Sequence, residues 1–274
     1  MPILMTYGDS NTHGTPPIVD RARYDRFGPG VRWPTVTQAA LGPSWQLAEE
    51  GLPGRTAQFD DPVMGAHMNG RVGLRIALQT HGPIDVLTLM LGTNDLKQRF
   101  SVNALDIALS LAKLVLAIRA SGCGPDGAAP GAPLLVGSSL GGYYATYLAE
   151  QHGLKALLIN PAVQPHLRFD GYLGPQKNYY SDETWDLTED HVQALAELDV
   201  APPSDPTRYQ IWLQTGDETL DYRDAERYYR ACALRIQAGG DHGFQGFAER
   251  LPAIFAFAGI SATLWRDTDF SVFN

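Results

Sequence analysis

The chain has 274 residues, of which 44% are hydrophobic and 10% aromatic, which is enough to bury a large core. Its formal net charge of −9, with no run of basic residues, argues against a nucleic acid or an anionic membrane as partner and favours a neutral small molecule. Cys123 and Cys232 are too few for a disulfide framework or a thiolate metal cluster. We find neither the pattern of a signal peptide nor a transmembrane stretch, and therefore expect a cytoplasmic protein.

Short apolar segments alternate with amphipathic ones, which is typical of a mostly parallel sheet covered by helices on both faces. Helices are predicted over 103–122 and 139–153, and a third begins after the N-cap candidate Thr188. Residues 122–133 are predicted to form a flexible surface connection. Strands are expected at 2–7, 45–49, 85–91, 134–136, 156–160, 209–214 and 234–237. The fold class is thus α/β, a three-layer α/β/α sandwich forming a single domain over 1–274.

Two serine motifs are typical of hydrolase nucleophiles: Gly8-Asp9-Ser10-Asn11, and Gly137-Ser138-Ser139-Leu140-Gly141. The second motif follows an apolar strand and precedes a helix, which is the context of a nucleophile elbow. The glycines at 137 and 141 are expected to permit a strained turn and close packing of helix on strand. Ser139 then projects above the sheet edge.

An acid and a histidine follow later strands in the order expected of an α/β hydrolase, with Asp217 before His242. Glu218 and Asp221 compete with Asp217 for the acid role. We favour Asp217 because it comes first after its strand and glycine.

Residues from about 134 to 260 resemble the YqiA-type esterases of the α/β-hydrolase superfamily. The matching segments are GSSLGGYYATYLAE, INPAV, YLGPQ, QTGDETLDYR and GGDHGFQGF. In such enzymes an early strand that ends in a His-Gly loop supplies part of the oxyanion hole. This chain has no such loop, so the resemblance leaves one oxyanion donor without a source.

Residues from about 2 to 133 resemble another family, the SGNH (GDSL-type) hydrolases of the bacterial arylesterase and acyltransferase branch. The matching segments are YGDSNTHG, RFGPGVRW, EEGLPGRT and LMLGTND. The resemblance implies that Ser10 is a nucleophile and that Gly54 and Asn94 are oxyanion donors. The Asp-x-x-His block of that family is absent here. The chain therefore resembles a hybrid of two hydrolase halves, 1–133 and 134–274, joined near Pro133.

A strand count favours Ser139 over Ser10 if the two halves share one continuous sheet in the SGNH strand order. The strand before His242 would then lie roughly 24 Å from the strand of Ser10 but only roughly 14 Å from that of Ser139. In the same arrangement, the loop with Thr93 and Asn94 replaces the missing His-Gly loop. We expect these two residues and the amide of Leu140 to be the oxyanion donors for Ser139.

The sequence predicts a carboxylic ester hydrolase that acts on short-chain or aryl esters through Ser139, His242 and Asp217. No cofactor is needed, and the spacing of the histidines does not indicate a metal site. The expected partner is a small-molecule ester, and the oligomeric state is open, a homo-oligomer included.

Three alternatives remain beside this prediction. The hybrid could be a catalytically silent scaffold, because a misplacement of about 1 Å costs roughly a hundredfold in rate. Residual SGNH-type esterase or acyltransferase activity at Ser10, assisted by His13 or a neighbouring subunit, is the second. In the third, Ser10 and Asn94 are only structural.

One long connection is rich in aromatic residues that could form a lid over an acyl pocket or simply pack: Tyr172, Tyr179, Tyr180 and Trp185.

Overall fold

The computed structural model describes residues 1–16, 25–128, 134–177 and 184–260, which form two compact units. Unit 1 comprises Met1–Val102, Leu109–Ala132 and Ala248–Asn274, and unit 2 comprises Asn103–Ala108 and Pro133–Phe247.

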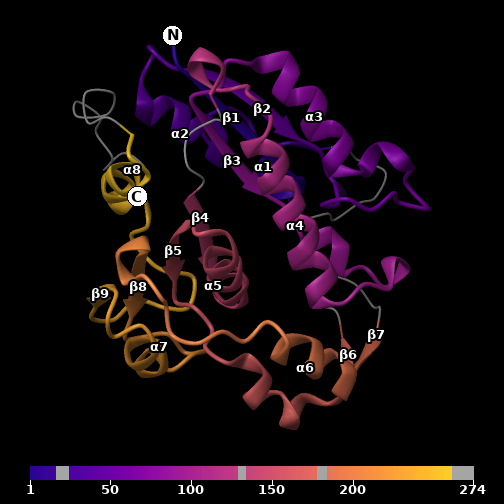
Figure 1. Cartoon of the computed structure of the whole chain (residues 1–274), viewed down its shortest axis with the longest axis vertical. Coiled ribbons are helices and arrows are strands. Elements are labelled where there is room, and N and C mark those ends of the chain that lie inside the picture. Colours follow the sequence, from indigo (N-terminus) through magenta and orange to yellow (C-terminus); the bar gives the residue numbers. More distant parts are fainter. Residues whose placement is uncertain (17–24, 129–133, 178–183, 261–274) are drawn as a thin grey trace. The chain divides into compact units, whose positions relative to one another are not determined.

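Unit 1 is built on a parallel sheet of the order β2-β1-β3 (Figure 1). Its strands are β1 (Ile3–Gly8), β2 (Gln46–Gly51) and β3 (Val86–Met90). Its helices are α1 (Ser10–His13), α2 (Trp33–Leu41), α3 (Gly70–His81), most of α4 (Ala104–Arg119) and α8 (Leu251–Ala258). Short 3-10 turns are η1 (Ala66–Met68), η2 (Thr93–Leu96), η3 (Gln98–Phe100), η4 (Pro125–Gly127) and η8 (Ala248–Arg250).

Alternate residues of β1 bury against helices on opposite faces of this sheet. Met5 and Tyr7 belong to one cluster with side chains of α3 and α4, among them Leu74 and Leu114. Leu4 belongs to the other cluster, with side chains of α2 and α8. Unit 1 therefore has three layers, with helices on both faces of its sheet.

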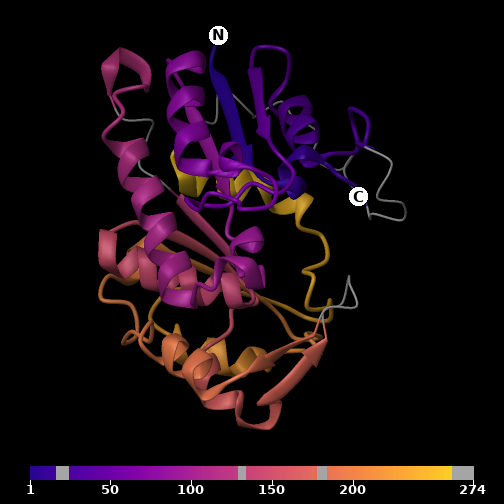
Figure 2. The same cartoon turned by 90° about the vertical axis from the view of Figure 1, so that its right-hand side faces the viewer.

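Unit 2 contains a parallel sheet of the order β4-β5-β8-β9 and a separate antiparallel pair, β6 and β7, which can be followed in Figure 2. The strands are β4 (Leu134–Ser138), β5 (Lys155–Ile159), β6 (Gly174–Lys177), β7 (Thr184–Leu187), β8 (Tyr209–Gln214) and β9 (Ala233–Gln237). The helices are α5 (Leu140–His152), α6 (Glu189–Ala196) and α7 (Tyr222–Tyr228), with 3-10 turns η5 (Pro165–Arg168), η6 (Asp170–Tyr172) and η7 (Pro206–Arg208). Side chains of α5 and α7 pack in one cluster with β5 and β8.

The α/β class and the predicted strands are confirmed, with ends that differ from the prediction by at most two residues. Side chains cap the starts of two of the predicted helices, the N-cap candidate Thr188 among them. Asn103 Oδ1 accepts from the Asp106 amide at 2.9 Å, and Thr188 forms a capping box with His191. Within the predicted connection 122–133, residues 125–127 form η4, while 129–133 lie outside the described residues.

The single continuous sheet is a wrong prediction. Among the described residues, β3 pairs only with β1, and β4 pairs only with β5. Register is strongly specified where one face of a strand is buried, and the residues of β3 are only partly buried or exposed.

Candidate active site

Ser139 occupies a strained turn between β4 and α5. Its φ of 54° and ψ of −127° lie outside the regions that L-residues favour, and such strain persists only where the surroundings fix it. Here the Ser139 amide donates to the Ile159 carbonyl at 3.1 Å, and the Ser139 carbonyl accepts from the Ala162 amide at 2.9 Å. Both partners belong to β5 or the loop after it, so the neighbouring strand holds the turn.

Close approach of backbones explains two glycines of this turn, but not the pair expected from the sequence. A Cβ on Gly137 would overlap the Gly141 carbonyl, and one on Gly142 would lie 2.6 Å from Pro161 Cβ. A Cβ on Gly141 would meet no atom within 4 Å. The prediction for position 137 is therefore confirmed. That for Gly141 is wrong, because its side faces open space and Gly142 is the residue that packs against the neighbouring loop.

Three side chains from the carboxyl ends of β4, β8 and β9 meet in unit 2. His242 Nε2 lies 2.9 Å from Ser139 Oγ, and His242 Nδ1 lies 2.9 and 3.0 Å from the two Asp217 carboxylate oxygens. The Asp217 side chain is only 2% exposed, whereas that of His242 is 24% exposed. An ionised carboxylate only accepts hydrogen bonds, so Nδ1 carries the proton and Nε2 accepts from the serine hydroxyl. This geometry allows His242 to remove a proton from Ser139.

The two acids that competed with Asp217 have other partners. Glu218 accepts from the backbone amide of His242 at 3.1 Å, whereas Asp221 caps α7 by accepting from the Arg223 amide at 3.0 Å. Asp217 Oδ1 also accepts from the Thr219 and Leu220 amides, at 2.9 and 2.8 Å, which fixes the orientation of its carboxylate.

Leu140 is the first residue of α5, so its amide is among the first four of that helix, which have no partner inside the helix. It follows Ser139 directly, as a donor for an oxyanion would. Thr93 and Asn94 belong to η2 in unit 1. Asn94 Nδ2 donates to the Arg55 carbonyl at 3.1 Å and to Asp9 Oδ2 at 3.5 Å. Both amide hydrogens of this buried side chain therefore have acceptors within unit 1.

The first serine motif lies at the end of β1. Asp9 caps α1 by accepting from the Asn11 amide at 2.9 Å. Through Arg55 and Asp9, the Asn94 side chain links the segments that carry Gly54 and Ser10. No hydrogen bond between the Ser10 hydroxyl and a histidine occurs within the part of the chain that the structure describes.

Burial shapes the ionisation of the acids around this first motif. It raises the pKa of Asp95 from 3.8 to about 6, and it also raises the pKa of Asp9. Asp95 is 1% exposed, and its carboxylate accepts from the Ala57 amide at 2.9 Å. Neither acid is hydrogen-bonded to a histidine across the described ranges. The cluster therefore lacks the acid and base pairing that unit 2 has.

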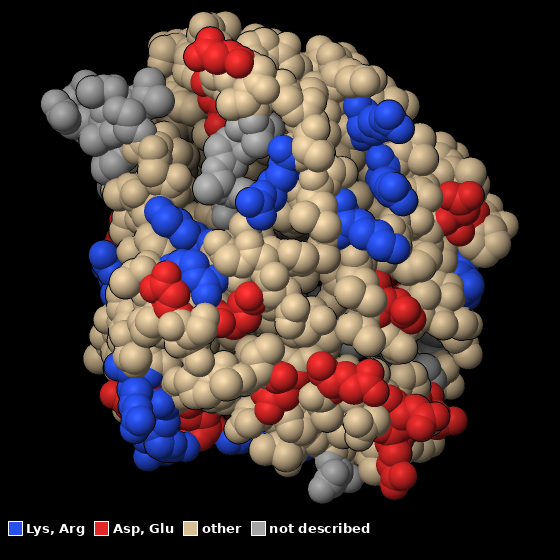
Figure 3. Space-filling model, in the orientation of Figure 1, with Lys and Arg blue, Asp and Glu red and all other residues tan. Residues whose placement is uncertain are grey.

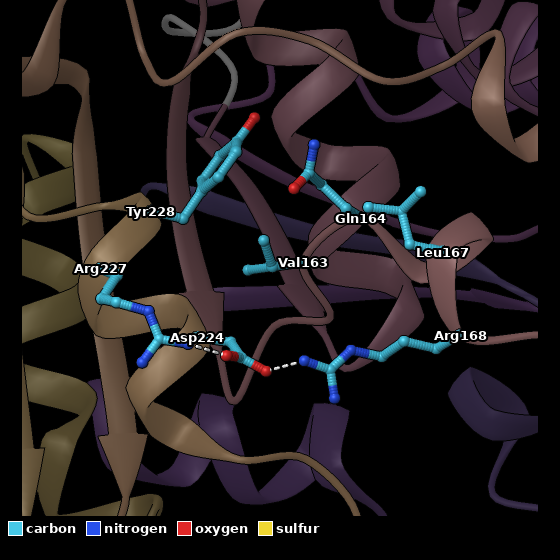
Figure 4. A pocket seen from close by; sticks show the side chains of 7 residues that line it. All are labelled: Val163, Gln164, Leu167, Arg168, Asp224, Arg227 and Tyr228. Atoms are coloured by element: carbon cyan, nitrogen blue, oxygen red, sulfur yellow. Dashed lines mark hydrogen bonds and ion pairs between the residues drawn. The ribbon is translucent and has the colours of Figure 1, made fainter.

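A cavity of about 520 Å³ lies between the loop after β5 and α7 (Figure 4). Asp224 stands between Arg168 and Arg227 and forms an ion pair with each. The other lining residues are Val163, Gln164, Leu167 and Tyr228. None of Ser139, Asp217 and His242 lines this cavity, so it is separate from the hydrogen-bonded serine, histidine and aspartate.

The proposed aromatic lid is only partly within the described residues. Tyr172 is exposed and its ring packs against Phe169 with centroids 6.2 Å apart. Trp185 belongs to β7, and Tyr179 and Tyr180 lie outside the described residues. Both alternatives for this aromatic connection, a lid over an acyl pocket and plain packing, stay predictions.

Exposed acidic side chains gather over α6 and β7 (Figure 3), among them Asp186, Glu189 and Asp190. Across the described ranges, no group of three or more His, Cys, Asp or Glu side chains could hold a metal ion. Within the same ranges, no helix combines the length and apolarity needed to cross a membrane.

Comparison with known proteins gives one family and several similar structures. Residues 110–259 match the family described as "Uncharacterised protein family (UPF0227)". A UPF0227 protein from Shewanella woodyi is 30% identical over 129 residues, which are 46% of this chain, and the chain spans 64% of the length of that relative.

Among solved structures, an aryl esterase of M. smegmatis has 26% identity and a TM-score of 0.47, with 86% of this chain and 84% of that chain covered. A carbohydrate acetylesterase from Sinorhizobium meliloti has 24% identity and a TM-score of 0.46, with the same coverage of 86% and 84%. The mouse alpha/beta hydrolase domain-containing protein 10 has 17% identity and a TM-score of 0.40, with 56% and 68% covered.

Proposed function

The chain belongs to the uncharacterised protein family UPF0227, and we propose that it is a carboxylic ester hydrolase with Ser139 as nucleophile. The observation that carries the proposal is the continuous line of hydrogen bonds from Ser139 Oγ through His242 to Asp217. The strained turn at Ser139 supports it further, because such strain is typical of a nucleophile held at the end of a strand.

The reaction follows from the positions of the protons. Ser139 Oγ attacks the acyl carbon while its proton passes to His242 Nε2, and Asp217 stabilises the imidazolium that forms. His242 then gives this proton to the leaving alcohol, and the acyl-enzyme remains on Ser139. In the second half, water attacks the acyl carbon with His242 as base, and the free acid and the serine hydroxyl are restored.

The oxyanion of the tetrahedral intermediate needs donors besides this line of side chains. We assign the Leu140 amide as one, because it is the first amide of α5 and follows the nucleophile. The expectation that Thr93 and Asn94 supply a second donor rested on one continuous sheet, and the separate sheets β2-β1-β3 and β4-β5-β8-β9 remove that basis.

Short-chain or aryl esters are the proposed substrates, which follows the resemblance of residues 2–133 to arylesterases. A small neutral ester also agrees with the net charge of −9, which disfavours an anionic partner. The alternative nucleophile, Ser10, has less support because its hydroxyl has no histidine partner among the described residues.

Hydrolysis of p-nitrophenyl acetate tests the proposal, with serine-directed labelling by a fluorophosphonate and peptide mapping. We expect the label on Ser139, no activity in Ser139→Ala, and most of the activity in Ser10→Ala. A wild-type protein that is folded yet neither hydrolyses the ester nor takes the label would favour the silent scaffold. A dead Ser10→Ala variant beside an active Ser139→Ala variant would favour the SGNH-type alternative.

A further inference from the structure

The segment that carries His242, residues 239–245, contains neither helix nor strand, yet the base must stay aligned with both Ser139 and Asp217. Gln214, the last residue of β8, supports this segment through hydrogen bonds of its side chain. It is 0% exposed, and its Oε1 accepts from the amides of Asp241 and Gln245 at 3.0 and 2.9 Å. Its Nε2 donates to the Gln245 carbonyl at 2.8 Å. One side chain thus fixes the backbone on both sides of His242.

Asn160, directly after β5, supports the same segment. It is 2% exposed, and its Nδ2 donates to the carbonyls of Asp241 and His242 at 3.1 and 3.3 Å. Its Oδ1 accepts from the Gln214 backbone amide at 2.9 Å, which ties the two supporting residues together. Asn160 has a φ of +39°, a left-handed conformation that Asn tolerates better than most residues.

Resting on the proposed function, we propose that Asn160 and Gln214 are positioning residues for the catalytic base, and we call the pair the amide clamp. A primary amide suits this task because it both donates and accepts, and because it carries no charge to desolvate. Every bond of the clamp to the segment is made to backbone atoms. Side-chain replacements at Asp241 and Gln245 therefore leave these bonds in place, whereas replacing the clamp releases the segment.

The shape of the segment fits the clamp closely. A Cβ on Gly240 would overlap Gln214 Oε1, and Gly240 has a φ of +76°, so a glycine at this position lets the amide oxygen reach the backbone. Two more bonds anchor the start of the segment to the loop after β8. The Gly216 amide donates to the Gly239 carbonyl, and the Gly239 amide donates to Thr215 Oγ1, both at 2.9 Å. A buried polar network with its partners satisfied favours a single arrangement, here the one that aligns His242.

The test compares Gln214→Met with Gln210→Met. Methionine has nearly the size of glutamine but cannot replace its hydrogen bonds. Gln210 lies on the same strand, and its Oε1 is buried with no hydrogen-bond partner among the described residues, which makes it a matched control. With p-nitrophenyl acetate, Gln214→Met should lower kcat by about 10²-fold with little change in KM, as expected for a misplacement of about 1 Å. Gln210→Met should keep the wild-type kcat.

Amide hydrogen exchange followed by mass spectrometry gives the readout that a general loss of stability does not move. In Gln214→Met, exchange should become faster in the peptide with residues 239–247 and stay unchanged in α5. The wild-type protein tests the clamp even if that variant does not fold. Its Asp241 and Gln245 amides, resolved by NMR, should exchange as slowly as those of β8.

Exchange of these two amides at the rate of unprotected loops would overturn the clamp, and so would a folded Gln214→Met variant with wild-type kcat. A failure of the proposed function looks different. In that case the wild-type protein leaves p-nitrophenyl acetate intact and Ser139 unlabelled, while the Asp241 and Gln245 amides still exchange slowly. The clamp would then exist as a structural feature, and its role in positioning a catalytic base would be refuted.

Discussion

Asp217→Asn is the sharpest perturbation of the proposed mechanism, because it exchanges one oxygen for an amide group without changing the shape of the side chain. In the wild-type protein, Oδ1 accepts from the amides of Thr219 and Leu220, and both carboxylate oxygens lie within 3.0 Å of His242 Nδ1. The asparagine oxygen should keep the two backbone bonds. Its NH₂ group is then left facing His242 Nδ1.

This orientation reverses the roles of the imidazole nitrogens. Facing a donor, Nδ1 must accept, so the proton of the neutral imidazole moves to Nε2, which points at Ser139 Oγ. The base then has no lone pair for the serine proton. The same replacement in a Ser-His-Asp protease lowers kcat by about 10⁴-fold, which corresponds to about 5.5 kcal/mol of transition-state stabilisation. We expect a loss of that order here, and little change in KM.

Steady-state hydrolysis of p-nitrophenyl acetate measures the effect, and thermal unfolding checks that the variant is folded. Asp221→Asn is the matched control, since Asn caps a helix as well as Asp does and the Asp221 carboxylate accepts from Arg223, whereas that of Asp217 lies beside His242. Its kcat should equal that of the wild type. An Asp217→Asn variant with a kcat within tenfold of the wild type would refute the assignment of Asp217 as the acid.

Three further predictions concern the turn, one buried acid of unit 1 and the cooperativity of folding. Gly142→Ala should lower the free energy of unfolding by about 1–3 kcal/mol because its Cβ would lie 2.6 Å from a proline side chain, whereas Gly141→Ala, with open space around it, should be neutral or stabilising in a denaturant titration. Burial raises the pKa of Asp95 from 3.8 to about 6, so the folded state binds this proton more tightly and the free energy of unfolding should fall by about 3 kcal/mol as the pH rises through that window. Asp95→Asn should weaken the fall of Tm between pH 4 and pH 7 without abolishing it, because burial also raises the pKa of Asp9. Finally, we propose that the whole chain is a single domain that unfolds in one cooperative transition, and two resolved calorimetric transitions would contradict this.

Ser139, Asp217 and His242 could be predicted to lie together because each stands in the segment that follows a strand of the parallel sheet, within five residues of the strand's end. The carboxyl ends of such strands meet at one edge, so spacing along the chain is enough to place the side chains together. The same reasoning failed for the continuous sheet. Strand order within each half follows from its own crossovers, but pairing between β3 and β4 depends on edges whose register no local pattern specifies.

The supporting contacts of the site could not be predicted, because they join side chains to distant backbone atoms. Asn160 and His242 are 82 positions apart, and Gln214 and Gln245 are 31 apart. A glutamine at the end of a strand gives no sign of which backbone groups it will meet. The role of Glu218 escaped prediction for the same reason. Its type and position suggested a catalytic acid, while its carboxylate accepts from the main chain of the histidine.

The two serine motifs differ in whether the nearby hydrogen-bond donors already have acceptors within the protein. The SGNH resemblance assigns Asn94 as an oxyanion donor for Ser10. Its side chain donates both amide hydrogens, one to the Arg55 carbonyl and one to Asp9 Oδ2, and so holds segments of unit 1 together. Around Ser139, the Leu140 amide begins a helix and has no acceptor within it, and the serine hydroxyl has a base. A donor already bound to a protein acceptor must give up that bond before it can stabilise an oxyanion, whereas a preorganised free amide requires no rearrangement. Residue type alone does not separate the two motifs, but the partners of the donors support the proposal that Ser139 is the nucleophile.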